Sequence, residues 1–271
     1  MRLVVGIIFV MVPVVIIQLL ITSLPASKLW QNVLLALFTP PTAIGAYFAF
    51  VHFIERRRPT ELATQNAPRE LLLGALIGAL LFGAVMAGLT LFGSLTIGGT
   101  NPWSVLLIPF IGAVTSGVFE EILFRGVLYR ILEEGLGSWL ALLLSGVVFG
   151  GLHLLNPNST LMGAAAVFLT AGILLGACFA LTRRLWLPMG LHFAWNLAQS
   201  GIFGLAVSGN AARAGLLESS LSGPAWLTGG EFGPEASMVT VVLGLLLGAL
   251  VLRQVVRGGQ IIDAPWRRKR G

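Results

Sequence analysis

The stretch "VLLIPFIGAVTSGVFEEILFRGVL", from Val105 to Leu128, is long and apolar enough to cross a lipid bilayer, which needs about 20 such residues. It nevertheless carries three ionisable side chains: Glu120, Glu121 and Arg125. Charged groups are costly near the centre of a bilayer unless they face protein or water. The stretch therefore predicts a membrane helix whose buried charges have a specific role.

The rest of the chain has the same apolar character. Hydrophobic residues make up 56% of the sequence and charged residues only 10%, with a mean hydropathy of +0.90. A soluble domain carries about 25% charged residues, so we expect an integral membrane protein. The single cysteine, Cys178, lies in an apolar run and is expected to pack there. Eight segments are long enough to span a bilayer, or nearly so: about 3–22, 31–54, 70–92, 105–128, 138–154, 161–182, 187–207 and 237–256. They predict an all-α, polytopic transmembrane helix bundle.

Basic residues predict how this bundle is oriented. If the N-terminus is cytoplasmic, 15 of the 17 lysines and arginines fall on the cytoplasmic side, and only Lys28 and Arg213 lie outside. This is the bias expected of cytoplasmic loops, so both termini are predicted to be cytoplasmic. The preference for arginine over lysine is typical of GC-rich bacterial genomes, which favours a bacterial plasma membrane. The net charge of +6 then reflects membrane orientation and gives no indication of nucleic-acid binding.

We divide the chain into three parts. Residues 1–104 are N-terminal membrane helices, and residues 105–208 form a core that carries the candidate chemistry. Residues 209–271 comprise an external loop, a last membrane helix and a basic tail. The loop, about 208–236, is rich in Gly, Ser and Pro and is predicted to be solvated, with Glu218, Glu231 and Glu235 in water. The tail is expected to contact anionic lipid head groups.

Spacing divides the charged residues of the fourth segment into two roles. Glu121 and Arg125 are four residues apart on one helix face, where they can neutralise each other. Glu120 is turned by about 100° from Glu121 and has no partner on its own helix. An unpaired carboxylate in apolar surroundings suits a group that takes and releases protons. The pattern predicts one glutamate that orients and one that reacts.

Two further pairs repeat the four-residue spacing. "FGGLH" puts Phe149 and His153 on one face of the fifth segment, and "HFAWN" puts His192 and Asn196 on one face of the seventh. Each pair alone is a weak signal, because a histidine in a membrane helix forms a hydrogen bond to another helix as often as it acts in catalysis. His52 has no such motif.

Taken in order, E-E-x-x-x-R, F-x-x-x-H and H-x-x-x-N on successive membrane helices resemble the CAAX protease and bacteriocin-processing family, also called Abi, of intramembrane endopeptidases. The family includes the Ras-converting CAAX endoprotease. The motifs lie between Glu120 and Asn196. This resemblance implies an endopeptidase in which Glu120 is the general base, His153 holds and polarises the water, and His192 and Asn196 stabilise the oxyanion. It implies supporting roles for Glu121, Arg125 and Phe149.

The resemblance leaves the metal and the substrate open. Glu120, His153 and His192 could bind zinc, but we favour a site without metal, because the residues do not form H-E-x-x-H.

A membrane protein or peptide is the expected substrate, of CAAX type or from peptide maturation or immunity. Glu120 and His192 are expected in the inner half of the membrane, with the site open to the cytoplasm. The alternative is a membrane transporter, or a scaffold or immunity protein without proteolytic activity.

Overall fold

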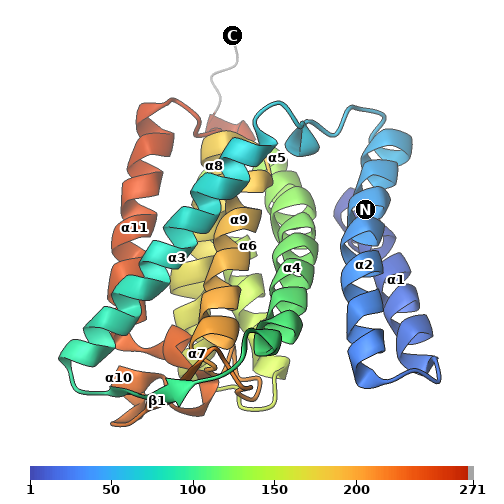
Figure 1. Ribbon diagram of the computed structural model, residues 1–271. Coiled ribbons are helices and arrows are strands. Elements are labelled where there is room, and N and C mark those ends of the chain that lie inside the picture. The colour runs from blue at the N-terminus through green and yellow to red at the C-terminus, as the bar shows by residue number, and fades with distance from the viewer. Residues whose placement is uncertain (268–271) are drawn as a thin grey trace.

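The computed structural model describes residues 1–267 as a bundle of helices (Figure 1), so Arg268, Lys269 and Arg270 of the predicted tail lie outside the described residues. Seven helices in this part are long and apolar enough to cross a membrane, which confirms the all-α, polytopic prediction. The α-helices are α1 (Arg2–Ser23), α2 (Lys28–Ala49), α3 (Ala67–Leu91), α4 (Leu107–Glu121), α5 (Arg130–Leu136), α6 (Ser138–Leu152), α7 (Leu161–Val167), α8 (Ile173–Thr182), α9 (Trp186–Asn196), α10 (Ala225–Thr228) and α11 (Met238–Arg257). Short π-helical segments extend several of them: η1 (Phe50–Ile54), η4 (Ile122–Tyr129), η6 (Phe168–Gly172) and η7 (Leu197–Ile202).

The fourth span is longer than predicted. It runs without a break from Trp103 to Leu136, 34 residues, whereas the apolar pattern indicated 105–128. The helix continues through charged residues because ion pairs satisfy them: Arg130 contacts Glu55 at 2.8 Å and Glu134 at 2.9 Å. Glu120 therefore lies near the middle of this helix. Its place in the inner half of the membrane stays a prediction.

The seventh predicted span is shorter than the others. α9 and η7 form one helix from Trp186 to Ile202, which ends before the predicted residue 207. It is not among the seven long apolar helices. Its side chains face other helices for much of its length, and His192 is 9% exposed. This helix is therefore an internal element of the bundle.

Charged residues gather at one end of the bundle. The α2–α3 loop, α5, the turn between α8 and α9 and the end of α11 all lie there (Figure 1). Ion pairs join these segments: Arg2 to Glu55 at 3.5 Å, Arg183 to Glu133, and Arg184 to Glu70. We call this the arginine-rich end. Many of the basic residues predicted to share one side of the membrane lie at this end, and its cytoplasmic location stays a prediction.

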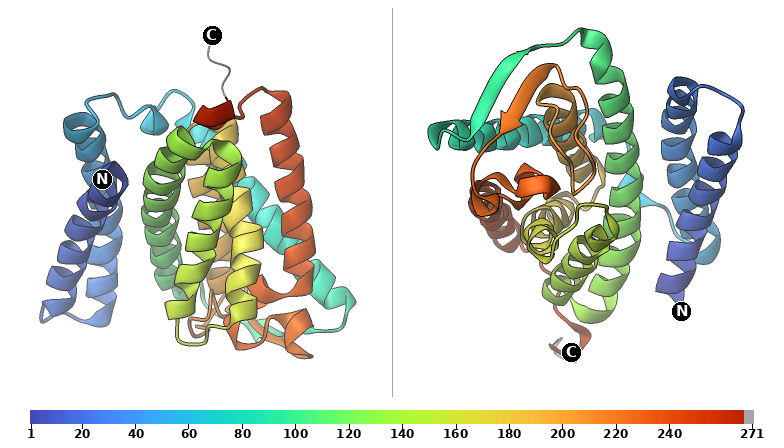
Figure 2. Two further views of the ribbon diagram at one scale, coloured as in Figure 1. Left: turned by 180° about the vertical axis from the view of Figure 1, so that it is seen from behind. Right: turned by 90° about the horizontal axis from the view of Figure 1, so that it is seen from below.

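The opposite end is covered by loops and a small sheet. Strands β1 (Leu95–Thr100) and β2 (Leu217–Leu221) pair antiparallel there, next to α10 (Figure 2). The long loop that contains β2 is only partly solvated, because Phe232 is 1% exposed and Glu235 7% exposed. The prediction that Glu235 lies in water is wrong. The composition of the loop suggested that it lies on the surface. The loop instead folds back under the bundle, which buries Phe232 and Glu235.

Glycines bring α9 against α3. A Cβ on Gly74 or Gly78 of α3 would lie 2.2 Å or 2.4 Å from backbone oxygens of α9, and a Cβ on Gly190 of α9 would lie 2.2 Å from the oxygen of Leu71. Only glycine allows such an approach, which is a common way to pack membrane helices. On the other side of α9, a Cβ on Gly117 of α4 would lie 3.2 Å from the amide nitrogen of Phe193. α9 is therefore held close to both α3 and α4.

Helices α1 and α2 form a hairpin beside α4 (Figure 2). At the arginine-rich end, the Tyr47 hydroxyl of α2 donates to the carbonyl of Gly126, at 3.2 Å, and Arg2 pairs with Glu134. Nearer the other end, Gln18 and Asn32 of the hairpin face a cavity. The hairpin is thus attached to the bundle at one end and borders a cavity at the other.

Candidate active site

The helix that carries the first motif and the helix that carries the third both change from α-helix to π-helix within the motif or directly after it. α4 ends at Glu121 and continues as the π-helical η4, and α9 ends at Asn196 and continues as η7. π-helical turns inside helices are rare and frequently mark functional sites. Here the wider turns begin directly next to the polar side chains.

Glu121 lies between a cation and an imidazole. Its Oε1 accepts hydrogen bonds from Arg125 Nη1 at 2.9 Å and from His192 Nδ1 at 2.8 Å. The ion pair predicted from the four-residue spacing is present, and Glu121 is fully buried. The bond to His192 joins α4 to α9. Because an ionised carboxylate only accepts hydrogen bonds, the proton lies on Nδ1, which leaves Nε2 of His192 free.

Glu120 is the more accessible of the two glutamates. Its side chain is 28% exposed, and its Oε2 lies 3.9 Å from Nε2 of His192. That distance is too long for a direct hydrogen bond. It suits two groups that both hydrogen-bond to one water molecule between them. Glu120 lines a cavity, as the absence of a partner on its own helix suggested.

The Phe149 ring packs between the charged residues of the site. Arg125 lies over its face at 4.6 Å, and the ring meets His153 at 4.9 Å and His192 at 6.3 Å between centroids. The Phe149 carbonyl accepts a hydrogen bond of 2.7 Å from His153 Nδ1. This bond fixes the imidazole at the end of α6, four residues after the Phe149 carbonyl.

Asn196 is oriented by a hydroxyl group. Its Nδ2 donates to Ser116 Oγ of α4 at 2.9 Å. One N–H of the amide is used in this way, and the second remains available. Ser116 belongs to none of the three motifs, and it lies four residues before Glu120 on the same helix face.

The four candidate catalytic residues share one cavity of about 500 Å³. Glu120, His153, His192 and Asn196 all line it. Three separate helical segments supply these residues, as the motifs predicted. The other lining residues come from α1, α2, α4, the segment after His153, η7 and the loop after η7. They include Gln18, Asn32, Thr115, Asn156, Ser200, Ser208, Asn210 and Arg213.

This cavity lies toward the loop end of the bundle. Asn156, Ser208, Asn210 and Arg213 belong to loops at the end opposite the arginine-rich end (Figure 1). The prediction of a cytoplasmic opening therefore conflicts with the prediction that the arginines are cytoplasmic. His153 lies at the loop end of α6 and reaches the cavity there.

Glu235 is a residue of the site that the motifs did not indicate. Its Oε2 accepts hydrogen bonds from the amide and the hydroxyl of Ser208, both at 2.7 Å, and its Oε1 accepts a weaker one from Trp195 Nε1 at 3.3 Å. Burial raises the pKa of Glu235 above its usual value, and the Ser208 hydroxyl and the nearby His153 oppose that effect. The sequence carried no signal for it beyond the presence of a glutamate just before the last helix.

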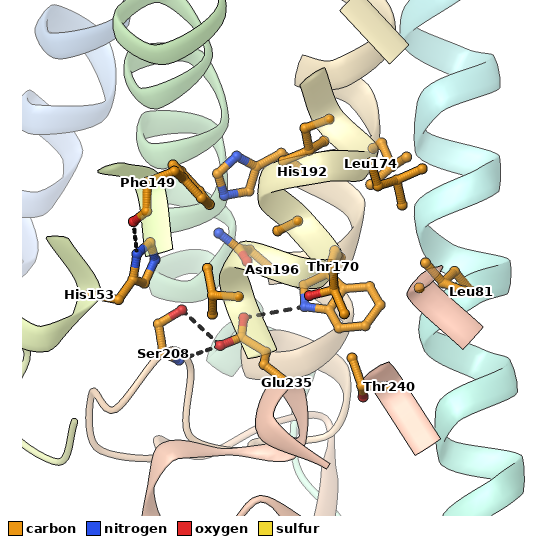
Figure 3. A pocket seen from close by; sticks show the side chains of 16 residues that line it. Leu81, Phe149, His153, Thr170, Leu174, His192, Asn196, Ser208, Glu235 and Thr240 are labelled. Carbon is orange, nitrogen blue, oxygen red and sulfur yellow. Dashed lines mark hydrogen bonds between the residues drawn. The ribbon is translucent and has the colours of Figure 1, made fainter. Parts of the chain in front are cut away.

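Figure 3 shows a second, small cavity of about 50 Å³ between these groups. His153, His192 and Asn196 line it from above, and Ser208 and Glu235 from below. Aliphatic side chains close its remaining walls, among them Leu81, Leu174, Leu175 and Leu191. The volume suffices for one or two water molecules, each of which needs roughly 10–15 Å³ by this measure.

A zinc site requires three or more ligands around one point. Within residues 1–267, no group of three His, Cys, Asp and Glu side chains is placed to hold a metal ion. Glu120 and His192 approach each other, but His153 does not complete a set with them. The side chains as they stand do not fit the three-ligand zinc site considered from the sequence.

Comparison with known proteins supports the resemblance. Residues 101–198 match the family model described as "Type II CAAX prenyl endopeptidase Rce1-like". The chain is also similar to "Putative membrane peptidase YdiL" of Bacillus subtilis (strain 168), with 29% identity over 93 residues. That alignment covers 34% of this chain and 36% of the relative. No solved structure matches the chain. The resemblance to this peptidase family is thereby confirmed for the part of the chain that holds the three motifs.

Proposed function

We propose that this chain, which matches the Rce1-like endopeptidase family in residues 101–198, hydrolyses peptide bonds within or next to the membrane. The observation that carries the proposal is the shared cavity of about 500 Å³, which brings together Glu120, His153, His192 and Asn196. Hydrolysis needs an activated water, a site for the oxyanion and a wet cavity. These four residues and the polar lining supply groups suited to each need.

In this mechanism Glu120 is the general base. It takes a proton from a water that lies between its carboxylate and the imidazoles, and the water oxygen attacks the carbonyl carbon of the substrate. The peptide nitrogen leaves as an amine after it receives the proton from Glu120. The 28% exposure of Glu120 allows water to reach it. His153, fixed through Nδ1, holds the water in place with its other nitrogen.

Asn196 and His192 stabilise the oxyanion in the proposal. Asn196 retains one free N–H, and Ser116 holds its amide in place. His192 is held through Nδ1 by Glu121, and its Nε2 is on the side of Glu120. It donates to the oxyanion in its imidazolium form, in which Nε2 also carries a proton. Donors held in place before the reaction contribute most to such catalysis, because they need no reorganisation. Glu121 and Arg125 therefore support the reaction by fixing His192.

We further propose that the substrate enters from the side of the membrane opposite the arginine-rich end. The positive-inside rule favours a cytoplasmic position for the arginine-rich end, and the cavity is lined by loops of the other end. The substrate class is then a membrane-anchored or exported peptide that presents an extended segment at the extracytoplasmic face. This replaces the cytoplasmic opening expected from the sequence.

Replacing Glu120 tests the proposal. Cells that make the wild-type chain are compared with cells that make Glu120→Gln by mass spectrometry of new peptide termini in the membrane proteome. We expect one or more new termini that disappear in Glu120→Gln. Glu231→Gln, which alters an exposed glutamate of the external loop, is the matched control and should keep them. A transporter or scaffold would produce the same termini in all three samples.

The metal question has its own measurement. Once a substrate peptide is known, the purified protein is washed with a chelator, its metal content is measured, and its activity is assayed. We expect the washed protein to remain active although its metal content is far below one ion per chain. Activity that is lost on washing and restored by zinc would replace this mechanism with a metal-dependent one.

A further inference from the structure

The small cavity of Figure 3 separates two sets of polar groups. One set is His153, His192 and Asn196, which the proposed function uses. The other is Ser208 and Glu235, which it does not use. A buried carboxylate is costly unless it is well bonded, so the position of Glu235 next to the site calls for an explanation.

Glu235 is fixed from two directions. Ser208 donates two hydrogen bonds of 2.7 Å to Oε2, and Trp195 donates one of 3.3 Å to Oε1. Trp195 is the residue before Asn196 on α9. The carboxylate therefore contacts the helix that carries His192 and Asn196 as well as the loop below it.

Ser208 is tied to the His153 segment in turn. Asn156, three residues after His153, donates from Nδ2 to the Ser208 carbonyl at 2.7 Å. Ser208 has a φ of +51°, a left-handed conformation that is unfavourable for a serine. Its amide, hydroxyl and carbonyl groups are all hydrogen-bonded, which stabilises this conformation. Backbone strain of this kind is often found at functional sites.

The backbone around Glu235 is also closely packed. Gly233, two residues earlier, has a φ of +111°, and a Cβ there would lie 2.2 Å from the carbonyl oxygen of Ala206. Ser237, two residues later, caps α11 by accepting from the amide of Thr240 at 3.0 Å. Glu235 therefore sits on a short, rigid turn, which is suited to holding a side chain in one place.

We propose that Glu235 is a positioning residue for His153: its carboxylate, together with Ser208, orients the imidazole through water in the small cavity and thereby sets the geometry of the hydrolytic site. Among the described residues, the side chain of Glu235 bonds Ser208 and Trp195 and the ring of His153 bonds the Phe149 carbonyl, so the two are not joined directly. Polar groups that line one cavity interact through a bridging water when one fits, and this cavity has the required volume. This inference rests on the proposed function.

Histidine-specific NMR tests the proposal without any substrate. The chain has three histidines, so protein labelled with ¹⁵N in the imidazole gives few signals, and His52→Gln and His153→Gln assign them. We expect Glu235→Gln to shift the ring nitrogen signals of His153 and to leave those of His52 unchanged. Glu231→Gln, on the same loop but exposed, should shift neither.

Two outcomes would overturn the proposal. One is a folded Glu235→Gln protein in which the His153 signals match the wild type. The other is an equal shift of His153 in Glu231→Gln. If Glu235→Gln does not fold, Ser208→Ala is the second variant, since it keeps the carboxylate and removes one of its donors. It should shift His153 in the same direction by a smaller amount, and an unchanged signal contradicts the proposal.

Kinetics separates positioning from structural support. With a substrate peptide from the proteome comparison, Glu235→Gln should lower kcat by about 10- to 100-fold, the size of effect expected from a misplaced reacting group, with KM unchanged. Glu235→Asp should restore part of kcat. Wild-type kcat in Glu235→Gln refutes the catalytic consequence. If the wild type itself cleaves nothing, the proposed function fails, and the NMR result still decides whether Glu235 positions His153.

Discussion

At the scale of single residues, Glu121 links the parts of the site. The sequence predicted its ion pair with Arg125, because the two residues are neighbours on one helix. Its bond to His192 spans 71 residues and depends on how α9 packs, so no local pattern could indicate it. The same reason explains why Ser116 and Glu235 were missed: each contacts the motif residues only through tertiary packing.

Asn196 provides a test at this scale. Asn196→Ala removes an oxyanion donor, which typically costs 10²–10³ in turnover. Activity should fall by about that factor and remain measurable. Ser116→Ala keeps the Asn196 amide but removes the hydroxyl that orients it. The decrease in kcat should therefore be smaller than in Asn196→Ala. Both are measured as kcat with a substrate peptide, and the assignment fails if Asn196→Ala keeps the full rate.

At the scale of helices, close packing determines where the motifs meet. α9 carries two motif residues, yet its position depends on the glycines of α3, which carries no residue of the site. The sequence contained this signal, since Gly74 and Gly78 form a G-x-x-x-G pattern typical of close membrane helix pairs. It did not indicate which helix would be the partner.

Two alanine substitutions on α3 test this packing. A Cβ at Gly78 would lie 2.4 Å from the Leu191 oxygen, whereas a Cβ at Gly83 would meet nothing within 4 Å. Gly78→Ala should force the helices apart and destabilise the protein by about 1–3 kcal/mol. Gly83→Ala should be neutral or slightly stabilising, by up to about 1 kcal/mol, because alanine favours a helix. Thermal unfolding in detergent compares them, and equal effects would contradict the packing argument.

At the scale of the whole molecule, the sequence predicted the class of fold well and the ends of single helices less well. Apolar run length gave the number of helices almost correctly, because the bilayer dictates that length. It misjudged the ends of the fourth span, since ion pairs allow a helix to continue through charged residues. The side of the membrane on which the cavity opens depends on the orientation of the bundle, which stays a prediction.

The orientation can be measured by cysteine labelling. Cys178, the single cysteine, is buried, and Cys178→Ala gives a background without thiols. In that background Ala211→Cys reports on the loop next to the cavity and Gln65→Cys on the arginine-rich end, both at exposed positions. In intact cells a membrane-impermeant maleimide should label the first and not the second. The reverse pattern would place the cavity on the cytoplasmic side.

The fully buried pair of Glu121 and Arg125 also has a consequence for biogenesis. The fourth helix is synthesised and offered to the translocon well before His192 and α9 exist. Isolated charges oppose insertion by about 2.5–3.5 kcal/mol each at the centre of a helix. A carboxylate and a guanidinium one turn apart can enter the bilayer as a neutral unit, and the imidazole is added when α9 arrives. Loss of either partner would then impair membrane integration of the nascent chain before any tertiary contact has formed.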